Sequence, residues 1–344
     1  MTFYAPQSKS HSVVEVRSSG SVPPQHIVNI SGGKDSASCY MLAVMRGKPF
    51  RAVTSDTGHE SEITYDWIRR LSERTGGPEV EVVKADFSKQ IARKRELVQT
   101  KWVAESVPDE IIRAALEVLH PTGNQFLDLC IWKGRFPSRM AQFCTEWLKA
   151  APIKAQVFDP ARAIGPVVSW QGERRDESQN RAKLPRILRI KEADLADLLI
   201  FRPILHWSAQ NTFALHDHFG LDPNPLYRLG MGRVGCFPCI NTNKTELSEI
   251  FLRFPEVLEK LRLYEHLVAM SSKRGKSTFF AASTTPQGKK LAQDHKLGLR
   301  LDETLPGIDD IAMWSRTSRG GKQFDGLKLM DSESLCSSQY GLCE

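Results

Sequence analysis

A short loop of glycine, serine and charged residues is the part of the sequence best suited to chemistry. It reads Ser31, Gly32, Gly33, Lys34, Asp35 and Ser36. The two glycines let the backbone turn tightly and approach a phosphate closely. The first amides of a helix, with the positive end of its dipole, attract an anion. The hydroxyls of Ser31 and Ser36 and the charge of Lys34 add to this, so the loop predicts a phosphate-binding site in which Lys34 neutralises a leaving pyrophosphate.

Two further groups of polar residues are candidates for the same site. Asp56 follows a second apolar run and could bind a ribose or magnesium, or simply cap the next helix. Arg174 and Arg175 could hold phosphates with their planar guanidinium groups. The alternative for these arginines is a surface cluster that pairs with the neighbouring acids Glu173, Asp176 and Glu177.

The chain has seven cysteines, and two of them have a spacing typical of a chelate. Cys236-x-x-Cys239 could place two thiolates on one metal, although redox sites share this pattern. Thiolate ligands suit either a [4Fe–4S] cluster or zinc. Cys130 and Cys144 are alternatively ordinary buried helix residues, and Cys39 is expected in the core.

The segments around the loop predict an α/β fold, a parallel sheet flanked by helices. Strands are expected over 26–30, 50–55, 80–84 and 167–171, and helices over 37–45 and 61–74. Strands that alternate with helices are typical of a parallel sheet. The loop at 31–36 then lies between a strand and a helix.

The remainder of the chain is predicted to be more helical. Helices are expected over 108–119, 140–150, 208–219 and 245–270, with Ser208 as N-cap, Gly220 just past the C-terminus and a break at Pro255. After about residue 273 we expect an irregular tail with short elements. The predicted division is a mobile leader over 1–24, a nucleotide-binding domain over 25–243 and a helical, irregular C-terminal extension over 244–344.

The composition is that of a globular protein without a membrane anchor. Of the 344 residues, 41% are hydrophobic and 25% are charged, and no apolar run approaches the length that spans a bilayer. The N-terminus lacks the apolar segment of a secretory signal, so a cytoplasmic location is expected. The net charge of +7 favours polyanionic partners. The segment 314–322, from Trp314 to Lys322, could bind a nucleic-acid backbone, close over the nucleotide or form a solvated basic loop.

The loop lacks the wider Walker spacing and resembles the SGGxDS signature of the PP-loop ATP pyrophosphatases, which have an adenine nucleotide α-hydrolase-like, Rossmann-like fold. Further segments resemble the phosphoadenosine phosphosulfate (PAPS) reductase family. They are Ser55-Asp56-Thr57-Gly58-His59-Glu60, Arg135-Phe136-Pro137-Ser138 with Phe143-Cys144-Thr145 and Leu148-Lys149, Gly172-Glu173-Arg174-Arg175-Asp176-Glu177-Ser178 with Arg181-Ala182, Arg202-Pro203-Ile204 through Trp207, Asn224-Pro225-Leu226-Tyr227 and Gly235-Cys236-Phe237-Pro238-Cys239. The resemblance covers about residues 26–243.

This resemblance implies a set of roles for individual residues. Besides the loop, Asp56, Thr57, Gly58, Gly172, Arg174 and Arg175 are expected to bind the nucleotide. Cys144, Cys236 and Cys239 are expected to hold a metal with Cys343 as fourth ligand, or with Cys336 or Cys130 in its place. Phe143 stands where the iron–sulfur reductases have a second cysteine.

The complete loop favours an enzyme that cleaves ATP, with Mg²⁺, to AMP and pyrophosphate, with Lys34 and Asp35 as catalytic residues. An acceptor is thereby activated for attack by sulfur or another nucleophile, and a sulfur-donor protein or a nucleic acid is a candidate partner. The first alternative is a reductase of PAPS or adenylyl sulfate with Cys343 as nucleophile. The second is a module that binds a nucleotide or DNA without turnover.

Overall fold

The structure, a computed structural model, describes residues 22–190, 197–300 and 303–317. Nearly all of the predicted leader lies outside these ranges, as do Cys336 and Cys343 and the basic residues from 318 to 322.

The predicted parallel α/β sheet is confirmed. Six strands lie in the order β3-β2-β1-β4-β6-β5, and every pairing is parallel except that of β5 with β6. The strands are β1 (Gln25–Asn29), β2 (Arg51–Asp56), β3 (Val80–Lys84), β4 (Val167–Trp170), β5 (Ile187–Arg189) and β6 (Leu198–Phe201). The last two were not predicted.

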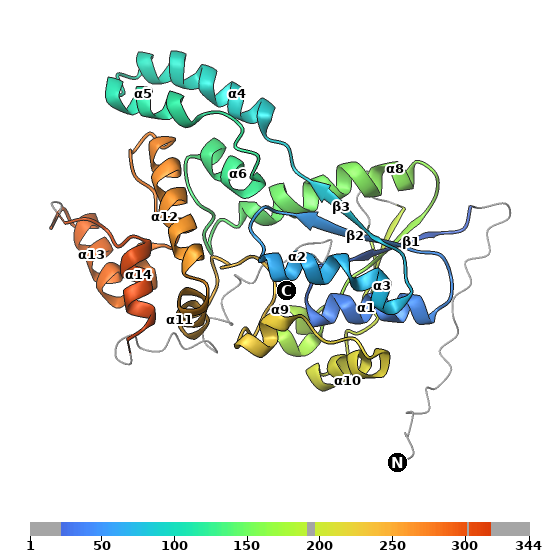
Figure 1. Cartoon of the computed structure of the whole chain (residues 1–344). Helices are drawn as coiled ribbons and strands as arrows, with labels where there is room; N and C mark the ends of the chain where they lie inside the picture. Colours follow the sequence, from blue (N-terminus) through green and yellow to red (C-terminus); the bar gives the residue numbers. More distant parts are fainter. Residues whose placement is uncertain (1–21, 191–196, 301–302, 318–344) are drawn as a thin grey trace.

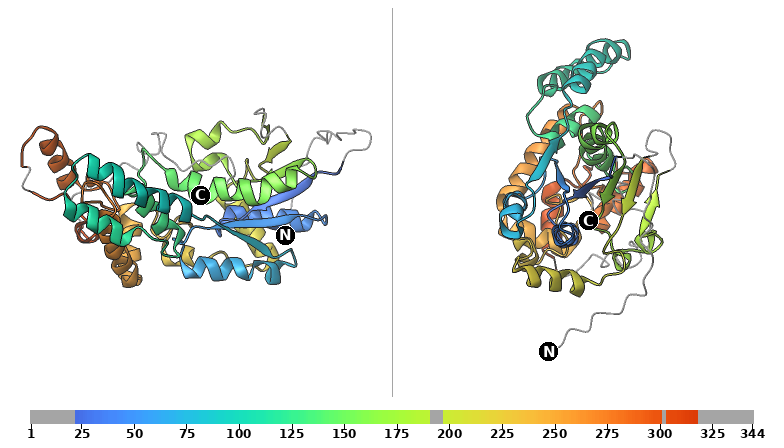
Figure 2. Two further views of the ribbon diagram at one scale, coloured as in Figure 1. Left: turned by 90° about the horizontal axis from the view of Figure 1, so that it is seen from above. Right: turned by 90° about the vertical axis from the view of Figure 1, so that its right-hand side faces the viewer.

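Helices cover both faces of the sheet because side chains of a strand alternate between its faces. On β1, Val28 packs with residues of α1 (Lys34–Met45), α2 (Glu62–Arg69), α3 (Leu71–Thr75) and α10 (Ala209–Phe219). Ile27 packs on the other face, against a continuous helical run. That run comprises η2 (Thr145–Ala150), α7 (Ala151–Ile153), η3 (Lys154–Phe158) and α8 (Asp159–Arg162). Figure 2 shows the sheet between these two layers.

The remaining helices gather at one end of the sheet around a second hydrophobic core (Figure 1). They are α4 (Ser88–Leu97), η1 (Val98–Trp102), α5 (Asp109–Val118), α6 (Gln125–Lys133), α11 (Lys244–Arg253), α12 (Pro255–Met270), α13 (Pro286–Lys296) and α14 (Ile308–Ser315). Short elements are η4 (Arg175–Glu177), α9 (Gln179–Ala182), η6 (Pro225–Leu229) and η7 (Ala282–Thr284). This core joins Phe126 and Phe237 to Phe251 and Leu261, so it crosses the predicted boundary at residue 243.

Several predicted helix ends are confirmed. The hydroxyl of Ser208 accepts the Asn211 amide at the start of α10, and Gly220 ends that helix in the left-handed conformation. The predicted break at Pro255 separates α11 from α12.

Two helix predictions were wrong in extent. The expected helix over 61–74 is two helices, which meet at Arg70, the C-cap of α2 and the N-cap of α3. The helix expected from Met140 begins later, since Ser138 and Ala141 bond to each other and Met140 is 95% exposed. None of the described helices is long and apolar enough to cross a membrane.

Candidate functional site

The phosphate-type loop lies where ligand sites of open α/β sheets are expected. β1 pairs with β2 on one side and with β4 on the other, so the chain leaves β1 and β4 in opposite directions across the sheet. Ligands bind at such a switch point, beyond the carboxyl ends of the strands. The loop after β4 comes so close that a Cβ on Gly172 would lie 2.6 Å from the Ser36 nitrogen and 2.7 Å from the Asp35 carbonyl carbon. The structure therefore brings the predicted residues 31–36 and 172–174 together.

The loop itself is held by its own serines and glycines. Gly32 has a φ of +84°, and a Cβ there would also lie 2.5 Å from Thr64 Cγ2. The Ser36 hydroxyl accepts the Ser31 amide at 3.1 Å and donates to the Gly33 carbonyl at 3.0 Å. Ser36 therefore closes the loop from within, and Ser31 Oγ lies 3.0 Å from Ser36 Oγ.

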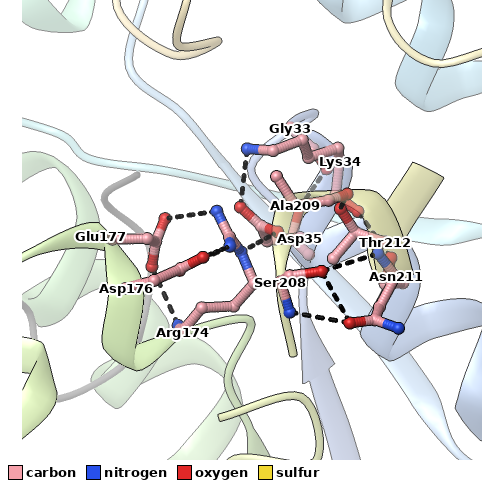
Figure 3. Close-up of polar contacts among 12 residues, drawn as sticks. Gly33, Lys34, Asp35, Arg174, Asp176, Glu177, Ser208, Ala209, Asn211 and Thr212 are labelled. Atoms are coloured by element: carbon pink, nitrogen blue, oxygen red, sulfur yellow. Dashed lines mark hydrogen bonds and ion pairs between the residues drawn. The ribbon is translucent and has the colours of Figure 1, made fainter. Parts of the chain in front are cut away.

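A buried chain of charges lies beside the loop (Figure 3). Asp35 is fully buried, and its Oδ2 accepts Lys34 Nζ at 2.9 Å while its Oδ1 accepts Arg174 Nε at 2.7 Å. Arg174 Nη1 donates to both oxygens of Asp176, at 2.5 and 2.7 Å. Burial raises the pKa of Asp35, and the ammonium of Lys34 and the guanidinium of Arg174 oppose that rise.

The two arginines predicted to bind nucleotide have different surroundings. Arg174 is buried among the carboxylates, and its amide donates to Glu177 at 2.9 Å. Arg175 is exposed, and its guanidinium donates to the Leu184 carbonyl at 3.2 Å. Arg174 thus pairs with Asp176 and Glu177 as the alternative expected, but in a buried position and together with Asp35, and its nucleotide-binding role stays a prediction.

The turn after β2 is tied together by Asp56. Its carboxylate accepts the Tyr65 hydroxyl at 2.6 Å and the Gly58 amide at 2.9 Å, and it pairs with Lys84 at 2.7 Å. Burial acts to raise the pKa of Asp56, but these partners outweigh it and the pKa is lowered. The Thr57 hydroxyl accepts the His59 amide at 3.2 Å. These contacts fix the shape of the turn at the carboxyl edge of the sheet.

The loop that carries Cys236 and Cys239 is attached to this turn. The Phe237 amide donates to the His59 carbonyl at 2.7 Å, and His59 Nε2 lies 3.0 Å from the Pro238 carbonyl. The Cys236 thiol lies 3.6 Å from Glu60 Oε1. His59 is fully buried against Phe126, and burial lowers its pKa to about 3.

Two neighbouring cavities share Ser31 and Lys149. The larger, of about 90 Å³, is also lined by Cys144, Cys236 and Cys239. The smaller, of about 10 Å³, is also lined by Glu60 and Tyr65. Burial acts to lower the pKa of Lys149, but Cys236 and Glu60 outweigh it and the pKa is raised. Lys149 therefore lies between the phosphate-type loop and the cysteines, with its Nζ 3.9 Å from Glu60 Oε1.

Three of the described cysteines are predicted metal ligands. Cys144, Cys236 and Cys239 converge on the larger cavity, whereas Cys130 is fully buried in α6 and Cys39 in α1. Burial raises the pKa of Cys144 to about 11 and that of Cys236 well above its usual value. Within residues 22–190, 197–300 and 303–317, no three His, Cys, Asp or Glu side chains are grouped to hold a metal ion. The described residues alone therefore form no metal site, and the predicted fourth ligand, Cys343, lies outside the described ranges.

The sequence analysis assigned no individual role to several residues that lie at the site. They are Glu60 and Lys149 between the cavities, and His216, Asn224 and Tyr227, which contact the phosphate-type loop. All but His216 lie in segments that carry the family resemblance, but that resemblance did not show which of them contact the loop. Trp314, considered for nucleic-acid stacking, is only 8% exposed and lies near Lys244.

Two family models match complementary parts of the chain. The phosphoadenosine phosphosulfate reductase domain matches residues 128–242, and the queuosine biosynthesis protein QueC matches residues 25–118. An uncharacterized 37.8 kDa protein of Escherichia phage 186 is 42% identical over 331 residues, which are 93% of this chain and 96% of the phage protein.

More distant similarities extend to named reductases. An adenosine 5′-phosphosulfate reductase of Mesorhizobium japonicum is 25% identical over 210 residues, which are 61% of this chain and 63% of that protein. Among solved structures, PAPS reductase from Candida auris matches with a TM-score of 0.37 and 16% identity, over 62% of this chain and 82% of that one.

Proposed function

The chain belongs to the phosphoadenosine phosphosulfate reductase family of adenine nucleotide α-hydrolase-like proteins, and we propose that it cleaves ATP to AMP and pyrophosphate. The AMP is transferred to an acceptor, which is thereby activated for sulfur transfer or a related modification. The bond between the α-phosphorus and the bridging oxygen breaks, and its electron pair leaves with pyrophosphate while the acceptor nucleophile bonds to that phosphorus.

The observation that carries this proposal is the complete loop Ser31–Ser36 at the switch point of the sheet. The loop opens α1, so the first amides of that helix and its dipole are available for the negative charge that builds on the leaving pyrophosphate. Lys34 is held beside the loop by Asp35, which in turn is held by Arg174. Mg²⁺ would accompany ATP and neutralise further charge on the phosphates.

Binding and turnover test this proposal separately. Calorimetry with ATP and magnesium, and separately with PAPS, should show tighter binding of ATP. Pyrophosphate release should then be lost in Lys34→Ala and Asp35→Ala, whereas Lys48→Ala removes an exposed lysine after the same helix and should retain it. Full pyrophosphate release by both loop variants would overturn the proposal.

The finer alternatives depend on residues outside the described ranges. Reduction of PAPS or adenylyl sulfate would need Cys343 as nucleophile, and Cys343→Ser should then abolish sulfite production. A metal at Cys144, Cys236, Cys239 and Cys343 also stays a prediction, tested by the iron and zinc content of anaerobically purified protein. A nucleic-acid substrate, a sulfur-donor protein and a cytoplasmic location stay predictions as well.

A further inference from the structure

Lys34 is held by a segment that follows it by almost two hundred residues. Its amide donates to the Tyr227 hydroxyl at 3.1 Å, and its carbonyl lies 3.2 Å from His216 Nε2. Its ammonium lies 5.4 Å from the centre of the Tyr227 ring. The neighbouring Gly32 carbonyl accepts Asn224 Nδ2 at 3.3 Å. Residues 216–227 therefore contact the backbone of the phosphate-type loop at three points.

These contacts fix the direction of the loop amides. A trans peptide is planar, and its N–H points away from its C=O. With the Gly32 carbonyl held by Asn224, the Gly33 amide must point to the opposite side of that peptide. The Lys34 carbonyl, which accepts the Ser38 hydroxyl at 2.9 Å and lies 3.2 Å from His216 Nε2, orients the Asp35 amide in the same way. Asn224 and His216 can thus aim amides at an anion that neither side chain touches.

The Gly33 amide donates to the Ser31 hydroxyl within the loop, at 3.4 Å, whereas the Lys34 amide donates to a hydroxyl from a distant segment, that of Tyr227. Gly33, the N-cap of α1, offers no side chain to bond the first amides of the helix. The Tyr227 hydroxyl bonds one of them instead, from a ring that packs edge-to-face with Phe213 at 6.0 Å between centroids. The hydroxyl therefore occupies a position that suits an oxygen of a bound phosphate.

We infer that Tyr227 is a displaceable cap on the Lys34 amide, and that Asn224 and His216 are positioning residues that aim the neighbouring amides at the incoming phosphate. The inference rests on the proposed function, since it assigns the phosphate to this loop. A hydrogen bond from an amide to a phosphate oxygen is charge-assisted and stronger than one to a neutral hydroxyl. The phosphate consequently replaces the Tyr227 hydroxyl, at the cost of the bond that the hydroxyl made.

If Tyr227 is a displaceable cap, removal of its hydroxyl should strengthen ligand binding rather than weaken it. Tyr227→Phe keeps the ring beside Phe213 and Lys34 but removes the competing hydroxyl. Binding of inorganic pyrophosphate and of ATP with magnesium should therefore tighten, by about 3- to 10-fold for one neutral hydrogen bond. A purely structural tyrosine would give weaker binding in the same variant.

The experiment is calorimetric titration of the full chain with both probes. Tyr264→Phe is the matched control, because it removes a tyrosine hydroxyl in α12, away from the loop contacts described above. Asn224→Asp tests the positioning contacts. It loses the donors to Gly32 and Thr64 and adds a negative charge, so both probes should bind more weakly, and the weakening should persist in the uncharged variant Asn224→Ser.

The outcomes separate this inference from the proposed function. Tighter binding by Tyr227→Phe, including binding that the wild type lacks, supports the cap. If the wild type binds ATP and releases pyrophosphate while Tyr227→Phe binds equally or more weakly, the cap is overturned and the proposed function stands. Absence of binding to either probe in both proteins would overturn both.

Discussion

At the scale of single residues, Arg174, which is predicted to bind nucleotide, also makes ion pairs within the protein. Its guanidinium lies between the carboxylates of Asp35 and Asp176, and only 6% of its side chain is exposed. Since Asp35 also pairs with Lys34, the role of Arg174 is to keep a buried carboxylate, and through it the lysine, in place. The sequence predicted that Arg174 belongs to the site, but it could not show which partner the guanidinium would take.

Loss of Arg174 should therefore be costly to folding. Arg174→Met leaves the fully buried Asp35 without one of its two cations, and removal of one partner of a buried pair costs about 3–5 kcal/mol. Asp176→Asn is the control, because the Asp176 side chain is 50% exposed and such pairs contribute about 0–1 kcal/mol. Urea unfolding measures both, and equal losses of unfolding free energy would contradict this view of Arg174.

Gly172 should tolerate no larger residue, for a steric reason. The atoms that a Cβ would meet belong to the backbone of Asp35 and Ser36, which cannot rotate away. Gly172→Ala should lower the unfolding free energy by about 1–3 kcal/mol and weaken ATP binding. Gly235→Ala, where a Cβ would meet nothing within 4 Å, is the control for stability. Thermal unfolding that gives both variants the same midpoint would refute the close approach.

At the scale of elements, the sequence predicted those with a clear pattern. The strand, loop and helix around residues 25–45 were predicted because an apolar run, two glycines and helix formers follow one another. The ends of α10 were predicted because Ser208 and Gly220 are characteristic caps. By contrast, α6 is buried on most sides and so lacks a polar face, while α4 buries only Ile91 and so lacks an apolar stripe. Neither pattern distinguishes a helix from other structures.

The turn between β2 and α2 should make stability depend on pH. His59 has a pKa of about 3 when folded, against about 6.5 when unfolded, so the unfolded chain binds the proton more readily between these values. Acidification from pH 7.5 to 5 should thus remove about 2 kcal/mol of unfolding free energy through His59. Urea unfolding at both pH values should show a smaller loss in His59→Asn.

The exposed His206 supplies the comparison for that measurement. His206→Asn should lose as much stability as the wild type on acidification. His26, whose pKa burial lowers to about 4, adds to the loss in all three proteins and so does not affect the comparison. An unchanged pH dependence in His59→Asn would contradict the assignment.

At the scale of the whole molecule, the C-terminal helices belong to the core that supports the site. Residues of α11, α12 and α14 share one hydrophobic cluster with Phe126 of α6 and with Phe237 of the cysteine loop. The predicted division at residue 243 followed the extent of the family resemblance, which ends there. The sequence could not show that the later helices pack onto the earlier ones, since packing partners are not encoded in local periodicity.

Two adjacent residues of α11 test this packing. Phe251 is 1% exposed, and Phe251→Ala should cost about 3–5 kcal/mol of unfolding free energy. Its neighbour Leu252 is 67% exposed, and Leu252→Ala should change stability by less than about 0.5 kcal/mol. Calorimetric melting should show one shifted transition in Phe251→Ala. If Phe251→Ala instead melts in two transitions, one at the wild-type temperature and one at a lower temperature, the C-terminal helices fold independently of the sheet.

The charged residues beside the loop neutralise one another. The cations Lys34, Arg174 and Arg181 are matched by the anions Asp35, Asp176 and Glu177. These six side chains alone therefore offer an arriving polyphosphate no net charge, so their part of the site attracts it through oriented amides and through a cation that travels with the ligand. Affinity of this kind depends little on ionic strength but strongly on the divalent ion, unlike binding to an open cluster of lysines.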